Sequence, residues 1–103
     1  MDRIAKLQEL LTQNPGDSFL QHALALESIK LGDDQQARHY FEKLLDKDPQ
    51  YVGSYYHLAK LLERCGDHAA AVQTYEKGME QAKKANDQHA LNELRGAWEE
   101  LTF

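Results

Sequence analysis

The sequence repeats itself at an offset of 34 residues. Pro49 follows Pro15 at this distance, and Leu24-Ala25 recurs as Leu58-Ala59. The further matches are Gly32-Asp33 with Gly66-Asp67, Ala37 with Ala71, and Phe41-Glu42-Lys43 with Tyr75-Glu76-Lys77. So many coincidences do not arise by chance. The chain is therefore built from a small motif that buries its apolar side by stacking on copies of itself.

The composition indicates that this motif is helical. Leu and Ala occur 27 times in the 103 residues, whereas Val, Ile and Thr together occur 7 times. Leu and Ala lose little side-chain entropy in a helix, while β-branched residues favour strands. We therefore expect a single all-helical domain and exclude an all-β fold.

Turn and capping residues divide the chain into helices. Gly32-Asp33 and Gly66-Asp67 each combine a residue that tolerates the left-handed conformation with an acid that caps the next helix. Ser18 and Gln21 resemble a capping box, which predicts a helix N-terminus shortly after the helix-breaking Pro15. Apolar residues recur at helical spacing between these signals. The sequence predicts six helices, over residues 3–13, 18–31, 34–47, 52–65, 68–84 and 87–101.

The repeated residues resemble the tetratricopeptide repeat family, whose 34-residue unit is a pair of antiparallel helices, A and B. The family's pattern of large and small residues is met by Tyr55, Leu58, Ala59, Ala71, Tyr75 and Gly78 in one repeat, and by Leu24, Ala25, Ala37, Phe41 and Pro49 in the other. Lys83 departs from the pattern, because it stands where a third proline would fall. The resemblance implies an all-α, right-handed solenoid of helical hairpins. Its parts are an N-terminal half-repeat over 1–17, full repeats over 18–51 and 52–85, and a capping helix over 86–103.

The resemblance also implies a binding surface. In tetratricopeptide proteins the A helices line a concave groove that commonly holds a peptide, and the family's groove positions carry over to nine residues here. They are Phe19, His22, Leu26, Lys30, Tyr56, Lys60, Glu63, Arg64 and Leu94. Aromatic side chains beside cations favour a partner segment with acidic groups and an apolar anchor. The sequence therefore predicts an adaptor or scaffold that binds a peptide or partner protein.

A less specific interpretation of the charged positions stays open. Lys60, Glu63 and Arg64 are equally consistent with a solvated helix face that carries weak ion pairs. The charged clamp of Lys, Asn and Arg with which some family members grip chaperone tails is absent. The matching positions hold His22, Leu26, His57, Asp87 and Leu91. Binding of chaperone tails is therefore disfavoured.

The last predicted helix carries an apolar stripe formed by Leu91, Leu94, Trp98 and Leu101. We favour the interpretation that this stripe packs on the preceding helix, so that the polar opposite face caps the solenoid. In the alternative, the stripe pairs with a second copy of the chain, and the protein is a subunit of a homo-oligomeric assembly. A monomer is favoured over a homodimer.

The sequence indicates neither a catalytic nor a metal site. None of the five histidines form a pair at the i, i+4 spacing of helical zinc motifs. The single cysteine, Cys65, ends an apolar stripe, so we expect a small buried thiol there and not a nucleophile. Glycine motifs that bind phosphate or dinucleotides do not occur. We therefore expect neither an enzyme nor a cofactor.

Charge and hydropathy exclude further classes. Seventeen acidic against twelve basic residues give a net charge of −5, the wrong sign for binding nucleic acid. No stretch approaches the roughly 20 apolar residues of a membrane helix, and the first residues are too polar for a secretory signal. One cysteine is compatible with a reducing compartment. We expect a cytoplasmic protein that binds neither nucleic acid nor membranes.

Overall fold

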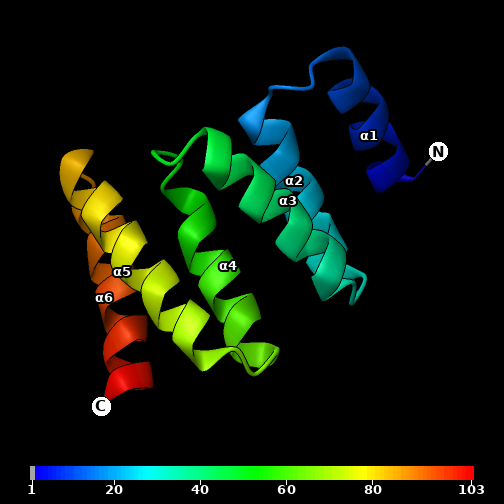
Figure 1. The fold of residues 1–103 in the computed structure, drawn as a ribbon. Coiled ribbons are helices and arrows are strands. Elements are labelled where there is room, and N and C mark those ends of the chain that lie inside the picture. Colours follow the sequence, from blue (N-terminus) through cyan, green and yellow to red (C-terminus); the bar gives the residue numbers. More distant parts are fainter. Residues whose placement is uncertain (1) are drawn as a thin grey trace. The chain divides into compact units, whose positions relative to one another are not determined.

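Helices account for nearly all of the chain. The computed structural model describes residues 2–103, and this range contains six α-helices and no strand (Figure 1). Packing contacts divide the chain into two units, the first ending at Asp48 and the second beginning at Pro49. The prediction of an all-α fold is confirmed.

The first unit contains α1 (Arg3–Gln13), α2 (Ser18–Lys30) and α3 (Asp34–Lys47). Helices α2 and α3 run antiparallel, and α1 packs against α2 (Figure 1). Ala25 and Ala37 are both 0% exposed, and their small side chains let α2 and α3 approach closely. The core where α1 meets α2 consists of Leu7, Leu20, Ala23 and Leu24, with Ile4, Leu11 and Tyr40 packed against it.

The second unit contains α4 (Gly53–Arg64), α5 (His68–Lys84) and α6 (Gln88–Thr102). Helix α5 packs against both neighbours, and α6 also contacts α4. The buried apolar residues are Tyr55, Leu58, Ala59, Leu61, Leu62, Ala71, Tyr75, Ala82, Leu91, Leu94 and Ala97. Because α6 touches both α4 and α5, side chains from α4 and α6 can form one surface within this unit.

The predicted turns are present. Gly32 and Gly66 have φ values of 77° and 81°, and the following Asp33 and Asp67 are the N-caps of α3 and α5. Asn86 takes the same role before α6, with a φ of 56°. In the first turn the amide of Asp33 donates to the carbonyl of Ser28 at 2.9 Å, which satisfies one of the last carbonyls of α2.

The start of α2 differs from the expected capping box. Asp17 is the N-cap, and its Oδ1 accepts from the amide of Leu20 at 3.1 Å. Ser18 is the first helical residue, and its hydroxyl donates to Oδ2 of Asp48 at 2.8 Å. The predicted helix was correct, but its cap was not. The acid one residue earlier satisfies the orphan amide, and the serine joins the two ends of the α2–α3 pair.

Candidate partner-binding surface

In the first unit, α2 carries four of the predicted binding residues at spacings of three or four. Phe19 is 65% exposed, Lys30 is exposed, and His22 and Leu26 are half-buried. The His22 ring meets the buried Phe41 ring edge-on, with centroids 5.8 Å apart. The four side chains therefore form a row, and Phe19 is its most exposed apolar member.

Lys30 has acidic company on its own unit. Its Nζ lies 3.3 Å from Oε1 of Glu27, and the same oxygen is 2.8 Å from Nε of Arg3. The Glu27 side chain is only 16% exposed, so it acts as a shared anchor for two solvent-facing cations. This arrangement ties α1 to α2 and partly neutralises Lys30.

In the second unit, α4 carries Tyr56, Lys60 and Glu63 in contact with one another. The Lys60 ammonium lies 5.7 Å from the centroid of the Tyr56 ring and 3.7 Å from Oε2 of Glu63. Arg64, one residue further on, is exposed. The Lys60–Glu63 contact is the i, i+3 ion pair that a solvated helix face would carry, and such pairs contribute about 0–1 kcal/mol. It therefore leaves Lys60 easy to redirect.

Glu63 has a structural partner as well. Its Oε2 accepts a hydrogen bond from the hydroxyl of Tyr75, which is fully buried on α5. Burial, followed by the bond to Glu63, raises the pKa of Tyr75 well above its usual value, so the hydroxyl stays protonated and donates. Glu63 thus joins α4 to α5.

Leu94 does not belong to the surface predicted from the sequence. Its side chain is 1% exposed and lies in the core of the second unit. The assignment of Leu94 to a binding groove is therefore corrected. The α6 residues that approach α4 are instead Glu93 and Glu100. Glu93 interacts electrostatically with His57, and Glu100 with Tyr75. Their i, i+7 spacing could have revealed this face, had the rotation of α6 been known.

His57 lies on α4 beside this acidic row. Desolvation by burial lowers the pKa of His57 below its usual value, and the nearby carboxylate of Glu93 opposes the shift. Burial is the larger effect, so the imidazole is neutral near pH 7. Glu93 consequently keeps its charge without an imidazolium next to it.

The thiol of Cys65 also departs from expectation. It is exposed and not buried, because Cys65 is the C-cap residue where α4 ends and turns away from the core. Among residues 2–103, no three His, Cys, Asp or Glu side chains are grouped so that they could hold a metal ion.

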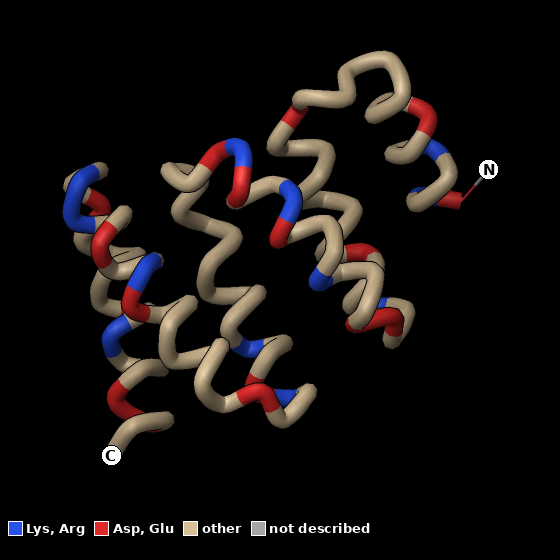
Figure 2. The backbone as a smooth tube through the Cα atoms, in the orientation of Figure 1, with Lys and Arg blue, Asp and Glu red and all other residues tan. Residues whose placement is uncertain are grey.

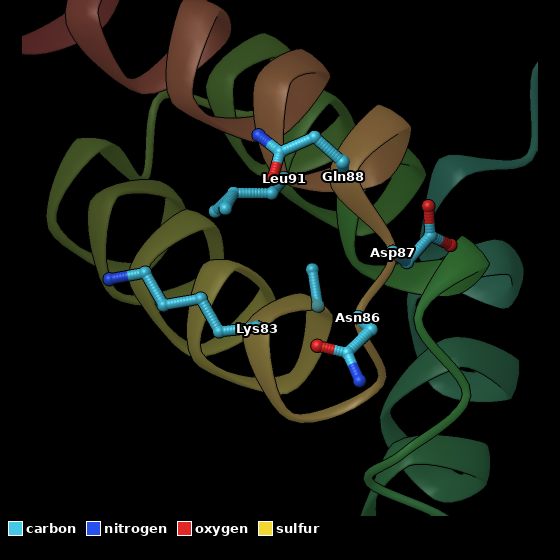
Figure 3. Close-up of a pocket in the computed structure, with 6 residues that line it drawn as sticks. Lys83, Asn86, Asp87, Gln88 and Leu91 are labelled. Atoms are coloured by element: carbon cyan, nitrogen blue, oxygen red, sulfur yellow. The ribbon is translucent and has the colours of Figure 1, made fainter.

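The clearest hollow in the second unit lies away from the predicted binding residues (Figure 3). Its volume is about 250 Å³, and its lining comes from the end of α5, the connecting loop and the start of α6. The lining residues are Ala82, Lys83, Asn86, Asp87, Gln88 and Leu91. Lysine and amide side chains around an apolar floor offer no acid–base pair or nucleophile.

Charges of both signs are interspersed along the backbone (Figure 2). Each of the six helices carries at least one acidic and one basic residue. The charge that a partner meets therefore depends on individual side chains. Within residues 2–103, no helix is long and apolar enough to span a membrane.

Comparisons with known proteins decide the family. Residues 28–94 match the family model described as Tetratricopeptide repeat. The chain belongs to the tetratricopeptide repeat family. Domains of this family are protein-interaction modules and are generally not enzymes. The resemblance predicted from the sequence is confirmed.

Other tetratricopeptide repeat (TPR) proteins resemble the chain over most of its length. A TPR repeat-containing protein of Pseudomonas aeruginosa is 26% identical over 91 residues, covering 88% of this chain and 87% of the relative. The solution structure of a tetratricopeptide repeat domain protein from Salinibacter ruber is 41% identical and has a TM-score of 0.81. That match covers 85% of this chain and 89% of the other.

A third similar structure contains a bound partner. The TPR2B domain of yeast Sti1, solved as a pHsp70 complex, has a TM-score of 0.88 and covers 96% of this chain and 79% of that one. At 19% identity, it shows a shared fold and no more. The TPR fold of this chain is thus one on which partner binding is known.

Proposed function

We propose that this protein is a non-catalytic adaptor that binds a segment of a partner protein on the exposed faces of its A helices. The faces are those of α2, with Phe19, His22, Leu26 and Lys30, and of α4, with Tyr56, Lys60, Glu63 and Arg64. In the family these faces line one groove. The proposal includes neither cofactor nor metal, and on the single cysteine it places the protein in the cytoplasm.

The exposed ring of Phe19 carries the proposal. A phenylalanine that is 65% exposed on a helix leaves a large apolar area in water, and such residues are frequent anchors at protein interfaces. Leu26 and Tyr56 are both half-buried, and they add apolar surface on the same type of helix face. A partner segment with an apolar anchor would cover these side chains.

An acidic group on the partner would recruit Lys60. When Lys60 turns toward a partner, Glu63 keeps its hydrogen bond from Tyr75 and is not left without a donor. The Lys60–Glu63 contact at 3.7 Å is weak enough to exchange. This arrangement supports a partner in which an acidic residue accompanies the apolar anchor.

The proposal is tested with peptides selected against the wild-type protein from a random library. We expect Phe19→Ala and Tyr56→Ala each to weaken a selected peptide about tenfold or more, as measured by calorimetry, because interface aromatics contribute most of the binding energy. His39→Ala on α3 and Gln73→Ala on α5 are matched controls, since both residues are exposed on B helices. Circular dichroism verifies that each variant is folded.

Loss of binding in the control variants, with the A-helix variants unaffected, would place the interface on the B helices. That result would overturn the proposal. An unsuccessful selection from a diverse library would also count against it.

A further inference from the structure

The surface between α4 and α6 has an acidic side that the sequence did not reveal. Glu93 and Glu100 are exposed on α6 and are separated by two helical turns, with Ala97 between them. Glu93 acts electrostatically on His57 of α4, and Glu100 on the hydroxyl of Tyr75. Both carboxylates therefore lie on the side of α6 that approaches α4. Ala97 is 7% exposed, and its small side chain leaves the space between them open.

Neither carboxylate forms an ion pair with another residue in the described range 2–103. The imidazole of His57 is neutral near pH 7, for the reason given above. On α4 the Lys60 ammonium is directed toward Tyr56 and Glu63. Across this surface, α4 thus presents an aromatic ring and a cation, and α6 presents two carboxylates without a counter-ion.

The position of Lys60 shows what chemistry this surface accepts. Its ammonium rests over the Tyr56 ring with a carboxylate 3.7 Å away, which is the arrangement expected for a basic side chain on an aromatic and acidic surface. A segment with acidic groups alone would meet Glu93 and Glu100 and be repelled by both. A segment that also carries a cation would compensate them.

We propose that the partner segment carries a lysine or arginine, which Glu93 and Glu100 receive, next to the acidic and apolar groups that face α4. This inference rests on the proposed function, because it concerns a segment bound on the same α4 face. It changes the expected partner from an acidic peptide to one with both signs of charge on either side of an apolar anchor.

The experiment compares two probes, acetyl-Asp-Trp-Lys-amide and the same peptide with norleucine in place of lysine. Norleucine keeps the aliphatic chain and removes the charge. Each peptide is titrated into the 15N-labelled protein at low salt, where exposed charges are least screened. We expect the amide signals of Tyr56, Glu93 and Ala97 to shift and saturate, with the lysine peptide bound about threefold more tightly, the size of an exposed charge contact.

The double variant Glu93→Gln, Glu100→Gln should bind both peptides equally, because the charge that distinguishes them has no partner left. The control Glu80→Gln, Glu99→Gln changes the net charge by the same amount at exposed positions of α5 and α6, and it should keep the threefold preference. A preference that persists in the first variant, or disappears in the second, would overturn the inference.

The same titration separates the two proposals. Equal binding of both peptides by the wild-type protein, with shifts at Tyr56, would leave the proposed function standing and refute the inference. Shifts confined to residues outside α2, α4 and α6, or none at all, would refute both for this class of ligand.

Discussion

Two glycines in the second unit show how one atom can set the distance between helices. A Cβ at Gly78 of α5 would lie 2.7 Å from the Cβ of Tyr55 and 3.1 Å from Cδ1 of Leu94, whereas a Cβ at Gly96 of α6 would meet nothing within 4 Å. Alanine is favoured over glycine by about 1 kcal/mol inside a helix, and this gain is common to both sites. Gly78→Ala must also push α4 away, which costs about 1–3 kcal/mol.

We therefore expect Gly96→Ala to be more stable than Gly78→Ala by about 1–3 kcal/mol in urea unfolding followed by circular dichroism. The comparison cancels the helix-propensity term, so only the packing term remains. Equal stabilities for the two variants would mean that α5 can move away from Tyr55 without cost.

Single side chains were also where the sequence predicted least. Leu94 was assigned to the binding surface because the register of the repeats was continued into α6, but helix α5 runs to Lys84 and α6 is rotated so that Leu94 faces the core. Cys65 was expected to be buried, and one residue beyond the last turn of α4 it is exposed. Both errors concern how a helix is rotated or where it ends, and apolar spacing fixes neither within one residue.

At the scale of the element, capping by aspartate starts most helices of this chain. Asp87 is the N-cap of α6, and its Oδ1 accepts from the amide of Ala90 at 3.0 Å. Replacing it with alanine leaves that amide without its acceptor. We expect Asp87→Ala to lower the free energy of unfolding by about 1 kcal/mol and Asp87→Asn to change it little, since asparagine caps about equally well.

Fluorescence of the single tryptophan, Trp98, reports this transition directly because Trp98 lies in α6. An equal loss in Asp87→Ala and Asp87→Asn would show that the negative charge, and not the hydrogen bond, is what stabilises the start of the helix.

Whole helices were predictable where the chain marks both ends. The predicted ranges 3–13, 34–47 and 68–84 agree with α1 (Arg3–Gln13), α3 (Asp34–Lys47) and α5 (His68–Lys84). Each follows an aspartate N-cap whose side chain accepts an amide hydrogen bond. Helix α4 begins at Gly53 without a side-chain cap, and there the prediction began one residue early. Local hydrogen-bonding signals therefore determine how accurately a boundary can be predicted.

At the scale of the molecule, a repeated sequence produced two packed units, each with its own buried residues. The offset of 34 residues predicted the helical hairpins, since every hairpin needs the same small and large residues. The candidate surface was less predictable than the fold. Four of its residues lie on α2 and four on α4 as expected, but the charge of the α4–α6 surface depends on Glu93 and Glu100, which belong to no repeat motif.

The oligomeric state follows from which apolar groups the fold leaves outside. Leu91 and Leu94 are 7% and 1% exposed, so only the half-buried Trp98 and Leu101 of the stripe remain accessible, next to the exposed Phe103. The Trp98 indole N–H donates to Glu76 of α5, and its ring meets Phe103 edge-on with centroids 5.8 Å apart. Most of the stripe is thus used within the second unit, and little is left to hold a second copy.

We expect a monomer of 11.8 kDa in light scattering after size exclusion, at tens of micromolar protein and neutral pH. The net charge of −5 adds repulsion between copies. A mass about twice as large that falls back to the monomer in Leu101→Glu would instead support homo-oligomeric assembly through the stripe. The matched variant Gln73→Glu introduces the same charge at an exposed position of α5 and should leave the mass unchanged in either case.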